Sequence, residues 1–188
     1  FTEVSGGQYI YAPSGGSTMY YNPVGTGSFK VLIDASDAGA GMDRVDFPAP
    51  GTDWTPTVTS SDNTAPSPYE YTYTFTTPSG ASPGLLNTTA FDLAGKSANA
   101  SFTLTKDNTA PAGGSIVYST AVTNVTSASI TLTAGSDTQA GINTRTLERA
   151  IAPYANGTCG TYGGFASIAT SPTSPYVDSG LASGSCYK

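Results

Sequence analysis

The sequence contains no histidine, and it is poor in charged residues, tryptophan and cysteine. Without histidine, the usual Ser-His-Asp and Cys-His arrangements for nucleophilic catalysis are excluded. Charged residues make up 11% of the chain, which is too few for a charged disordered tail or a helical bundle. We therefore expect a folded protein that is not an enzyme.

Positive charge and long apolar runs are also scarce. The chain has 7 Lys plus Arg against 13 Asp plus Glu, so it offers no basic stripe for a phosphate backbone. No apolar run approaches the roughly 18 residues of a membrane helix, and the amino end lacks the basic and apolar regions of a signal peptide. We expect no nucleic-acid partner, no membrane insertion, and a chain that is mature or a fragment.

The sequence has two cysteines, Cys159 and Cys186, both in its second half. Two cysteines without histidine cannot form a zinc site of the usual kind, which leaves a disulfide or free thiols. A disulfide here would contribute roughly 3.6 kcal/mol by the chain-entropy model. We favour the disulfide, which predicts an oxidising, extracellular location.

Strand-forming patterns account for most of what is present. Thr, Tyr, Gly and Pro are abundant, as expected of short strands joined by many turns. Apolar and polar residues alternate in 29–35, 69–75 and 98–105, so each segment predicts a strand with one buried face. In 98–105 the inward residues are expected to be Ala98, Ala100, Phe102 and Leu104. The fold class is therefore all-β.

Shorter segments complete the expected first module. We expect strands at 44–47 and 86–91, an opening strand at 9–11 or 19–21, and a weaker strand at 55–59. About seven strands suit an immunoglobulin-like β-sandwich of roughly 100 residues.

A turn motif occurs twice, roughly 100 residues apart. Asp37 precedes Gly41, and Asp137 precedes Gly141, with the same spacing. Asp can accept hydrogen bonds from amides two residues on, and Gly can adopt positive φ, so each motif predicts a tight corner. Aligning the two corners brings Ile130, Leu132 and Ala134 within one residue of Val31, Ile33 and Ala35, and we match these two strands. We therefore predict two tandem modules.

The domain boundaries follow from this alignment. We place a complete sandwich at 1–106, a linker at 107–114 and a second sandwich at 115–188. The linker begins with Asp107 to Pro111, whose sequence also occurs at 62–66. Fewer residues follow Asp137 than follow Asp37 within the first module, so we expect the second sandwich to lack its last strands. Either the parent chain continues, or another chain donates a strand.

Several segments together resemble a known family. They are 19–23, 37–48, 90–95, 147–150, 156–162 and 184–187. In order and spacing they are similar to the tandem Ig-like or fibronectin-type repeats of large secreted or cell-surface bacterial proteins, found especially in actinobacteria. The resemblance implies a non-catalytic repeat and a pairing of Cys159 with Cys186. Lys96 stands where the family's motif usually continues with Asn.

Two sites for ligands are considered. Asp37, Asp92, Asp107 and Asn108 would suit Ca²⁺ if they converge where one module meets the next; otherwise the aspartates cap turns and begin a linker. Tyrosines and Trp54 would suit sugar rings if exposed, and Trp54 is the ring we expect to be exposed. Tyr69, Tyr71 and Tyr73 are expected in the core.

Three functions remain at this point. The favoured one is a structural or adhesive repeat segment of an extracellular or cell-surface protein, with neighbouring repeats as its partners. The second is a pilus-like filament subunit completed by a strand from an identical neighbour. The third is a glycan-binding accessory module. A carboxylate pair such as Asp43 with Asp46 is set aside as a catalytic pair, because residues three apart on a strand point to opposite faces.

Overall fold

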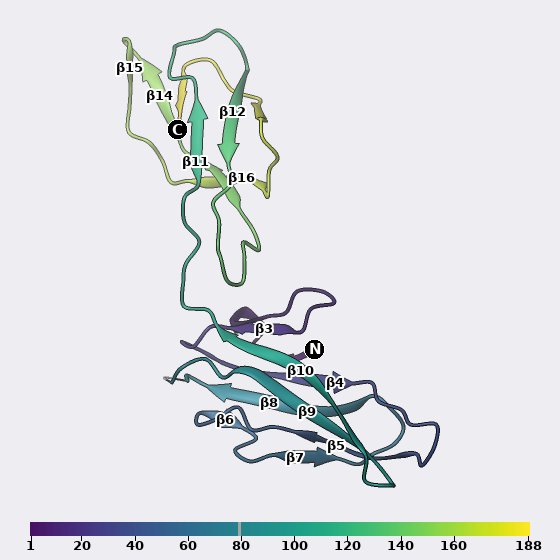
Figure 1. Cartoon of the computed structure of the whole chain (residues 1–188). Helices are drawn as coiled ribbons and strands as arrows, with labels where there is room; N and C mark the ends of the chain where they lie inside the picture. The colour runs from purple at the N-terminus through teal and green to yellow at the C-terminus, as the bar shows by residue number, and fades with distance from the viewer. Residues whose placement is uncertain (79) are drawn as a thin grey trace. The chain divides into compact units, whose positions relative to one another are not determined.

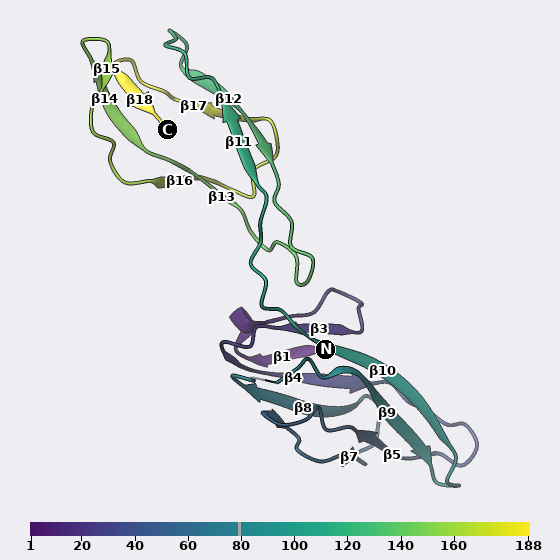
Figure 2. The ribbon, with the colours of Figure 1, turned by 60° about the vertical axis from the view of Figure 1, so that its left-hand side comes forward.

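The chain is almost entirely β, as its alternating sequence predicts (Figures 1 and 2). The computed structural model describes residues 1–78 and 80–188. They form two compact units, Phe1–Thr109 (unit 1) and Ala110–Lys188 (unit 2). Across the described residues, no helix has the length and apolar character needed to cross a membrane.

Unit 1 consists of two sheets. One is four-stranded with the order β1-β4-β8-β6, and the other is six-stranded with the order β2-β3-β10-β9-β5-β7. Neighbouring strands are antiparallel except β3 and β10, which are parallel. The strands are β1 (Thr2–Ser5), β2 (Ile10–Tyr11), β3 (Thr18–Tyr21), β4 (Thr26–Ile33), β5 (Met42–Phe47), β6 (Trp54–Thr55), β7 (Ser60–Asp62), β8 (Tyr69–Thr76), β9 (Gly84–Asp92) and β10 (Ser97–Lys106).

The core of unit 1 lies between these two sheets and is rich in aromatic rings. The Tyr73 ring packs edge-on against Phe102 at a centroid distance of 5.5 Å, which joins β8 to β10. Tyr69 and Tyr73 are buried, as the alternation of 69–75 predicted. Burial of aromatic side chains is a large stabilising contribution. The buried set is Met19, Tyr21, Phe29, Val31, Val45, Phe47, Trp54, Tyr69, Tyr73, Phe75, Phe102 and Leu104.

Two expectations for unit 1 need correction. Both candidate opening segments form strands, β2 and β3, and the described residues contain more strands than the seven expected. In β10, Phe102 and Leu104 are buried, but Ala98 and Ala100 are exposed. Strand β3 pairs with β10 only from Thr103 onward, so the first half of β10 is an edge that β9 alone covers.

Unit 2 is built from smaller sheets. Their orders are β11-β12-β17, β13-β16 and β15-β14-β18. Its larger buried apolar residues are Ile130 and Leu147, while Ile151, Phe165 and Val177 are exposed. The strands are β11 (Ser115–Tyr118), β12 (Ser127–Thr133), β13 (Thr146–Arg149), β14 (Ile151–Ala155), β15 (Thr158–Cys159), β16 (Ala166–Thr170), β17 (Tyr176–Ser179) and β18 (Ser185–Tyr187).

Strand pairing gives a more exact correspondence between residues of the two units than the alignment of their turns. Ile33 lies opposite Tyr69, and Ile130 lies opposite Tyr176. Two residues further along, the Ala35 amide donates to Ser67 Oγ at 3.3 Å, and the Leu132 amide donates to Ser174 Oγ at 2.9 Å. Ile130 is therefore the counterpart of Ile33, and the predicted match of Ile130 with Val31 was wrong. The partner strand sets this register, because each Ser-Pro-Tyr segment places its tyrosine opposite the isoleucine.

Candidate functional site

The predicted Asp-Gly corners form with the same hydrogen bonds in both units. Asp37 Oδ1 accepts from the amides of Gly39 at 3.0 Å and Gly41 at 2.9 Å. Asp137 Oδ1 accepts from the amides of Gln139 at 2.8 Å and Gly141 at 3.1 Å. Gly41 and Gly141 have φ of 84° and 80°, a region that glycine enters without a steric penalty. One carboxylate oxygen thus organises each corner, as the sequence predicted.

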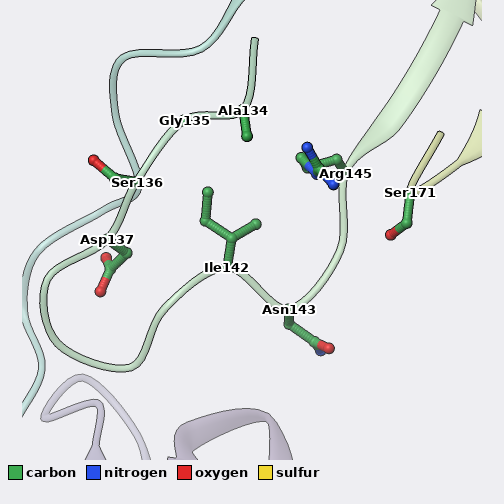
Figure 3. Close-up of a pocket in the computed structure, with 8 residues that line it drawn as sticks. All are labelled: Ala134, Gly135, Ser136, Asp137, Ile142, Asn143, Arg145 and Ser171. Carbon is green, nitrogen blue, oxygen red and sulfur yellow. The ribbon is translucent and has the colours of Figure 1, made fainter. Parts of the chain in front are cut away.

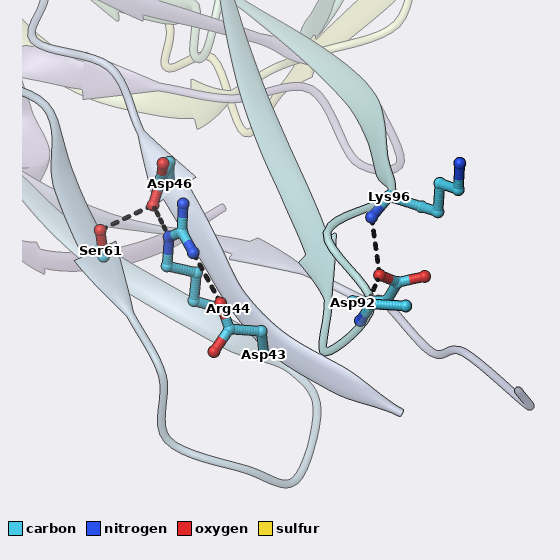
Figure 4. Close-up of polar contacts among 7 residues, drawn as sticks. Asp43, Arg44, Asp46, Ser61, Asp92 and Lys96 are labelled. Atoms are coloured by element: carbon cyan, nitrogen blue, oxygen red, sulfur yellow. Dashed lines mark hydrogen bonds and ion pairs between the residues drawn. The ribbon is translucent and has the colours of Figure 1, made fainter. Parts of the chain in front are cut away.

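A third corner of this kind begins at Asp92, between β9 and β10. Asp92 Oδ1 accepts from the amides of Ala94 at 2.9 Å and Lys96 at 2.7 Å (Figure 4). Because Lys96 takes part through its backbone, its side chain is free to vary without disturbing the turn. The Leu93 amide donates to the Gly41 carbonyl at 3.0 Å, so the Asp37 and Asp92 corners lie side by side at one end of unit 1.

The four residues considered for calcium do not form one cluster. Asp92 precedes the first residue of β10, whereas Asp107 follows its last residue. A strand of that length extends roughly 33 Å, so Asp107 and Asn108 lie far from Asp37 and Asp92. Asp107 Oδ1 accepts from the Thr109 amide at 3.1 Å, as Asp62 Oδ1 does from Thr64 at 2.9 Å in the earlier copy of this sequence. Residues 1–78 and 80–188 contain no group of three or more acidic, His or Cys side chains placed to hold a metal ion.

Trp54 is buried, contrary to the expectation that its ring is exposed. Its side chain is 4% exposed. It packs edge-on against Tyr21 at 4.9 Å and lies 5.2 Å from Phe75, measured between ring centroids. Strand β6 places Trp54 opposite Phe75 on the core-facing side of β8. A strand of two residues is too short for alternation to reveal its inward face, so the sequence carried no signal for this burial.

The outward side of the six-stranded sheet carries a charged network centred on Arg44. Arg44 donates through Nε to Asp46 at 3.0 Å and through Nη1 to Asp43 at 2.6 Å, and Ser61 Oγ donates to Asp46 at 2.6 Å (Figure 4). The hydrogen bonds that Arg44 donates to Asp43 and Asp46 raise its pKa. The guanidinium also covers the Phe91 ring at 4.2 Å, a favourable cation–π geometry.

Asp43 and Asp46 therefore share one partner, although their spacing predicted opposite faces. The pairing of β5 with β9 shifts register between Met42 and Arg44. Such an irregularity changes the direction of a side chain on an otherwise regular strand.

A second group of outward side chains, Tyr11 and Tyr20, was not singled out from the sequence. Their rings lie 6.5 Å apart at an angle of 24°, and Tyr11 is 49% exposed. The sequence did carry a signal for these two rings, because each is next to a residue that turns toward the core, Ile10 or Tyr21. Alternation along a strand then places Tyr11 and Tyr20 on the outward face.

Unit 2 contains an open hollow of about 330 Å³ beside the Asp137 corner. The side chains of Ile142 and Arg145 point into it, and Asn143 and Ser171 lie at its rim (Figure 3). Asp137 also lines it, with one oxygen already engaged by the amides of its own turn. The hollow is open to solvent, and both polar and apolar residues line it.

The predicted disulfide joins Cys159 to Cys186, whose Cα atoms are 5.8 Å apart. It connects β15 and β18, and both strands pair with β14. Close by, Arg149 Nη1 donates to Asp178 Oδ1 at 2.7 Å, with Asp178 6% exposed. These two links hold together strands that bury little apolar surface.

Comparison with protein families, curated proteins and solved structures finds no match to this chain.

Proposed function

We propose that this chain is a non-catalytic structural and adhesive segment of an extracellular protein, built from tandem immunoglobulin-like β-sandwich modules. The sheet orders of unit 1 support the fold. An immunoglobulin-like sandwich has strands A, B, E and D in one sheet and G, F, C and C′ in the other. The orders β1-β4-β8-β6 and β10-β9-β5-β7 correspond to these two sets.

The observation that carries the proposal is the recurrence of one local architecture in both units. The Ile-Tyr cross-strand pair, the Ser Oγ acceptor and the Asp-Gly corner occur in each, in the same chain order. A module repeated along a chain sets a spacing between whatever lies at its ends. The disulfide fits an oxidising compartment outside the cell.

Single-molecule stretching of the chain tests the mechanical part of this proposal. Unit 1 spans Phe1–Thr109, and its cooperative unfolding should release roughly 360–390 Å of chain. The disulfide bridges a sequence separation of 27 residues, so reduction should add roughly 90 Å to the extension of unit 2. Extension at low force without discrete unfolding events would contradict a module that resists stretching.

A specific observation favours the filament subunit as a second candidate. Within the described residues, β13 pairs with β16 alone, and exposed apolar side chains occur nearby at Ile151 and Phe165. An open edge next to apolar surface is suited to receive a strand from a neighbouring chain. Gel filtration over a hundredfold range of concentration separates the candidates: polymers that persist on dilution indicate the filament, and a constant monomer rejects it.

A further inference from the structure

Register fixes the direction of Tyr11, which is exposed, and Tyr20, which is half-buried, at the edge of the six-stranded sheet. Ile10 pairs with Tyr21, and Tyr11 pairs with Tyr20. Tyr21 is 1% exposed in the core, and successive side chains of a strand point to opposite faces. Tyr11 and Tyr20 therefore both project from the outward face, with their ring planes within 24° of each other.

The outward face continues from these rings across two further strands with hydroxyl and amide groups and one exposed apolar side chain, Leu85, which lies opposite Thr103. Thr105 lies next to Tyr20, and Thr103 next to Thr18. On the next strand pair, Ser101 Oγ and Asn87 Oδ1 are hydrogen-bonded at 2.7 Å. The outward residues of β3, β10 and β9 up to this point are uncharged, and charge begins with Arg44 and Asp46 on β5.

This combination has the chemistry of a neutral sugar chain. A pyranose presents C–H groups on its ring faces and hydroxyls around its edge. Aromatic rings with polar tips pack well against the C–H faces, and Thr, Ser and Asn side chains exchange hydrogen bonds with the hydroxyls. Stacking of single-stranded nucleic acid on the same rings would require a positively charged groove, and the outward residues that the structure describes on β2, β3, β10 and β9 include no Lys or Arg.

We propose that the outward face formed by Tyr11, Tyr20, Thr103, Thr105, Ser101 and Asn87, here called the tyrosine face, binds a neutral polysaccharide. Four strands from β2 to β9 span roughly 14 Å, which is wider than one sugar ring. A polymer that crosses the strands would contact the rings and the hydroxyl groups together, whereas a monosaccharide would contact one or the other.

The inference rests on the adhesive part of the proposed function, and it names the partner. It moves the sugar-binding hypothesis from Trp54, which is buried, to Tyr11, which is exposed, and Tyr20, which is partly exposed. The two proposals can fail independently. Single-molecule stretching tests the mechanical resistance of the folded units, whereas polysaccharide retention tests binding at an outer surface of unit 1.

The test is a pull-down and affinity-gel assay of the full chain on microcrystalline cellulose, chitin and a soluble neutral glucan, with heparin as the anionic probe. We expect retention on at least one neutral polysaccharide and none on heparin. Tyr11→Ala with Tyr20→Ala should weaken that retention about tenfold or more, since it removes both stacking rings. Thr105→Lys, which keeps the rings but places a long charged side chain beside Tyr20, should also weaken it.

Tyr118→Ala is the matched control, because Tyr118 is a 41% exposed tyrosine on a strand of unit 2. It should leave retention unchanged. Circular dichroism and the Trp54 fluorescence spectrum show whether each variant keeps the core of unit 1. The proposal is overturned if no neutral polysaccharide retains the chain, if heparin alone retains it, or if folded tyrosine-face variants bind as well as the parent.

Discussion

The Leu93 amide donates to the Gly41 carbonyl at 3.0 Å and so joins two Asp-Gly corners that are far apart in the sequence. Each corner is already closed by its own aspartate, Asp37 or Asp92. The bond extends the pairing of β5 and β9 beyond Met42 and Asp92, the last residue pair of that ladder. This end of unit 1 is thus stabilised by backbone hydrogen bonds, and the Asp37 and Asp92 carboxylates hold the backbone in position to form them.

Replacing Gly41 with alanine should destabilise unit 1 by about 1 kcal/mol, because φ at this residue is 84°. Space is not the reason, since an added Cβ would meet Leu93 Cδ1 at an ordinary 3.8 Å. Gly39→Ala is the matched control in the same turn, and it should change stability little. Urea denaturation followed by Trp54 fluorescence measures both; equal losses for the two variants would refute the conformational explanation.

Truncating Trp54 to alanine should cost about 3–5 kcal/mol, the usual range for a large buried aromatic residue. The ring packs against both Tyr21 and Phe75. Val58→Ala, at a residue 69% exposed, is the control and should cost little. Circular dichroism during urea unfolding measures the difference. A cost below about 1 kcal/mol for Trp54→Ala would show that the ring is not part of the core.

Reduction of Cys159–Cys186 should destabilise unit 2 by roughly 3–4 kcal/mol, because the open chain gains conformational freedom when unfolded. Unit 1 should be unaffected. Trp54 is the chain's single tryptophan and lies in unit 1, so its fluorescence follows that unit alone. Hydrogen exchange with and without reductant measures unit 2. Equal protection of β14 and β18 in both states would contradict a stabilising role for the bond.

Protonation of Asp62 should weaken unit 1 at acidic pH. Partial burial acts to raise the pKa of Asp62, but hydrogen bonds from the amides of Glu70 and Thr64 outweigh it and lower that pKa. Unfolded Asp titrates near about 3.9, so the contribution is complete above that pH. It is lost as pH falls through the lower pKa of the folded state.

Melting temperature measured from pH 6 to pH 2 tests this prediction. The melting temperature of the wild-type chain should fall more over this range than that of the Asp62→Asn variant, in which residue 62 no longer titrates. The difference between them should be largest near pH 6 and shrink in acid. Parallel melting curves across the whole range would exclude a contribution from Asp62.

Much of unit 1 was predictable because its strands are long enough to alternate. The segment 69–75 carries four inward aromatic rings in succession, and a shift of one residue would expose all of them. The Asp-Gly corners were predictable for a similar reason, since each is closed by hydrogen bonds within five residues. The burial of Trp54 was not predictable, because it lies on a two-residue strand. The Asp43–Arg44–Asp46 network was not predictable either, because it follows an irregularity in strand pairing.

The sequence by itself therefore determined the all-β class, the two corners at Asp37 and Asp137, and the burial of Tyr69 and Tyr73, all of which depend on local periodicity or local hydrogen bonds. Tertiary structure alone decided which residues from distant strands meet. Pairing across the sheets buried Trp54, separated Asp107 from Asp92 by the length of β10, and placed Tyr11 beside Tyr20 on an open face. These outcomes depend on strand register, which is a property of two segments together and is not encoded in either one.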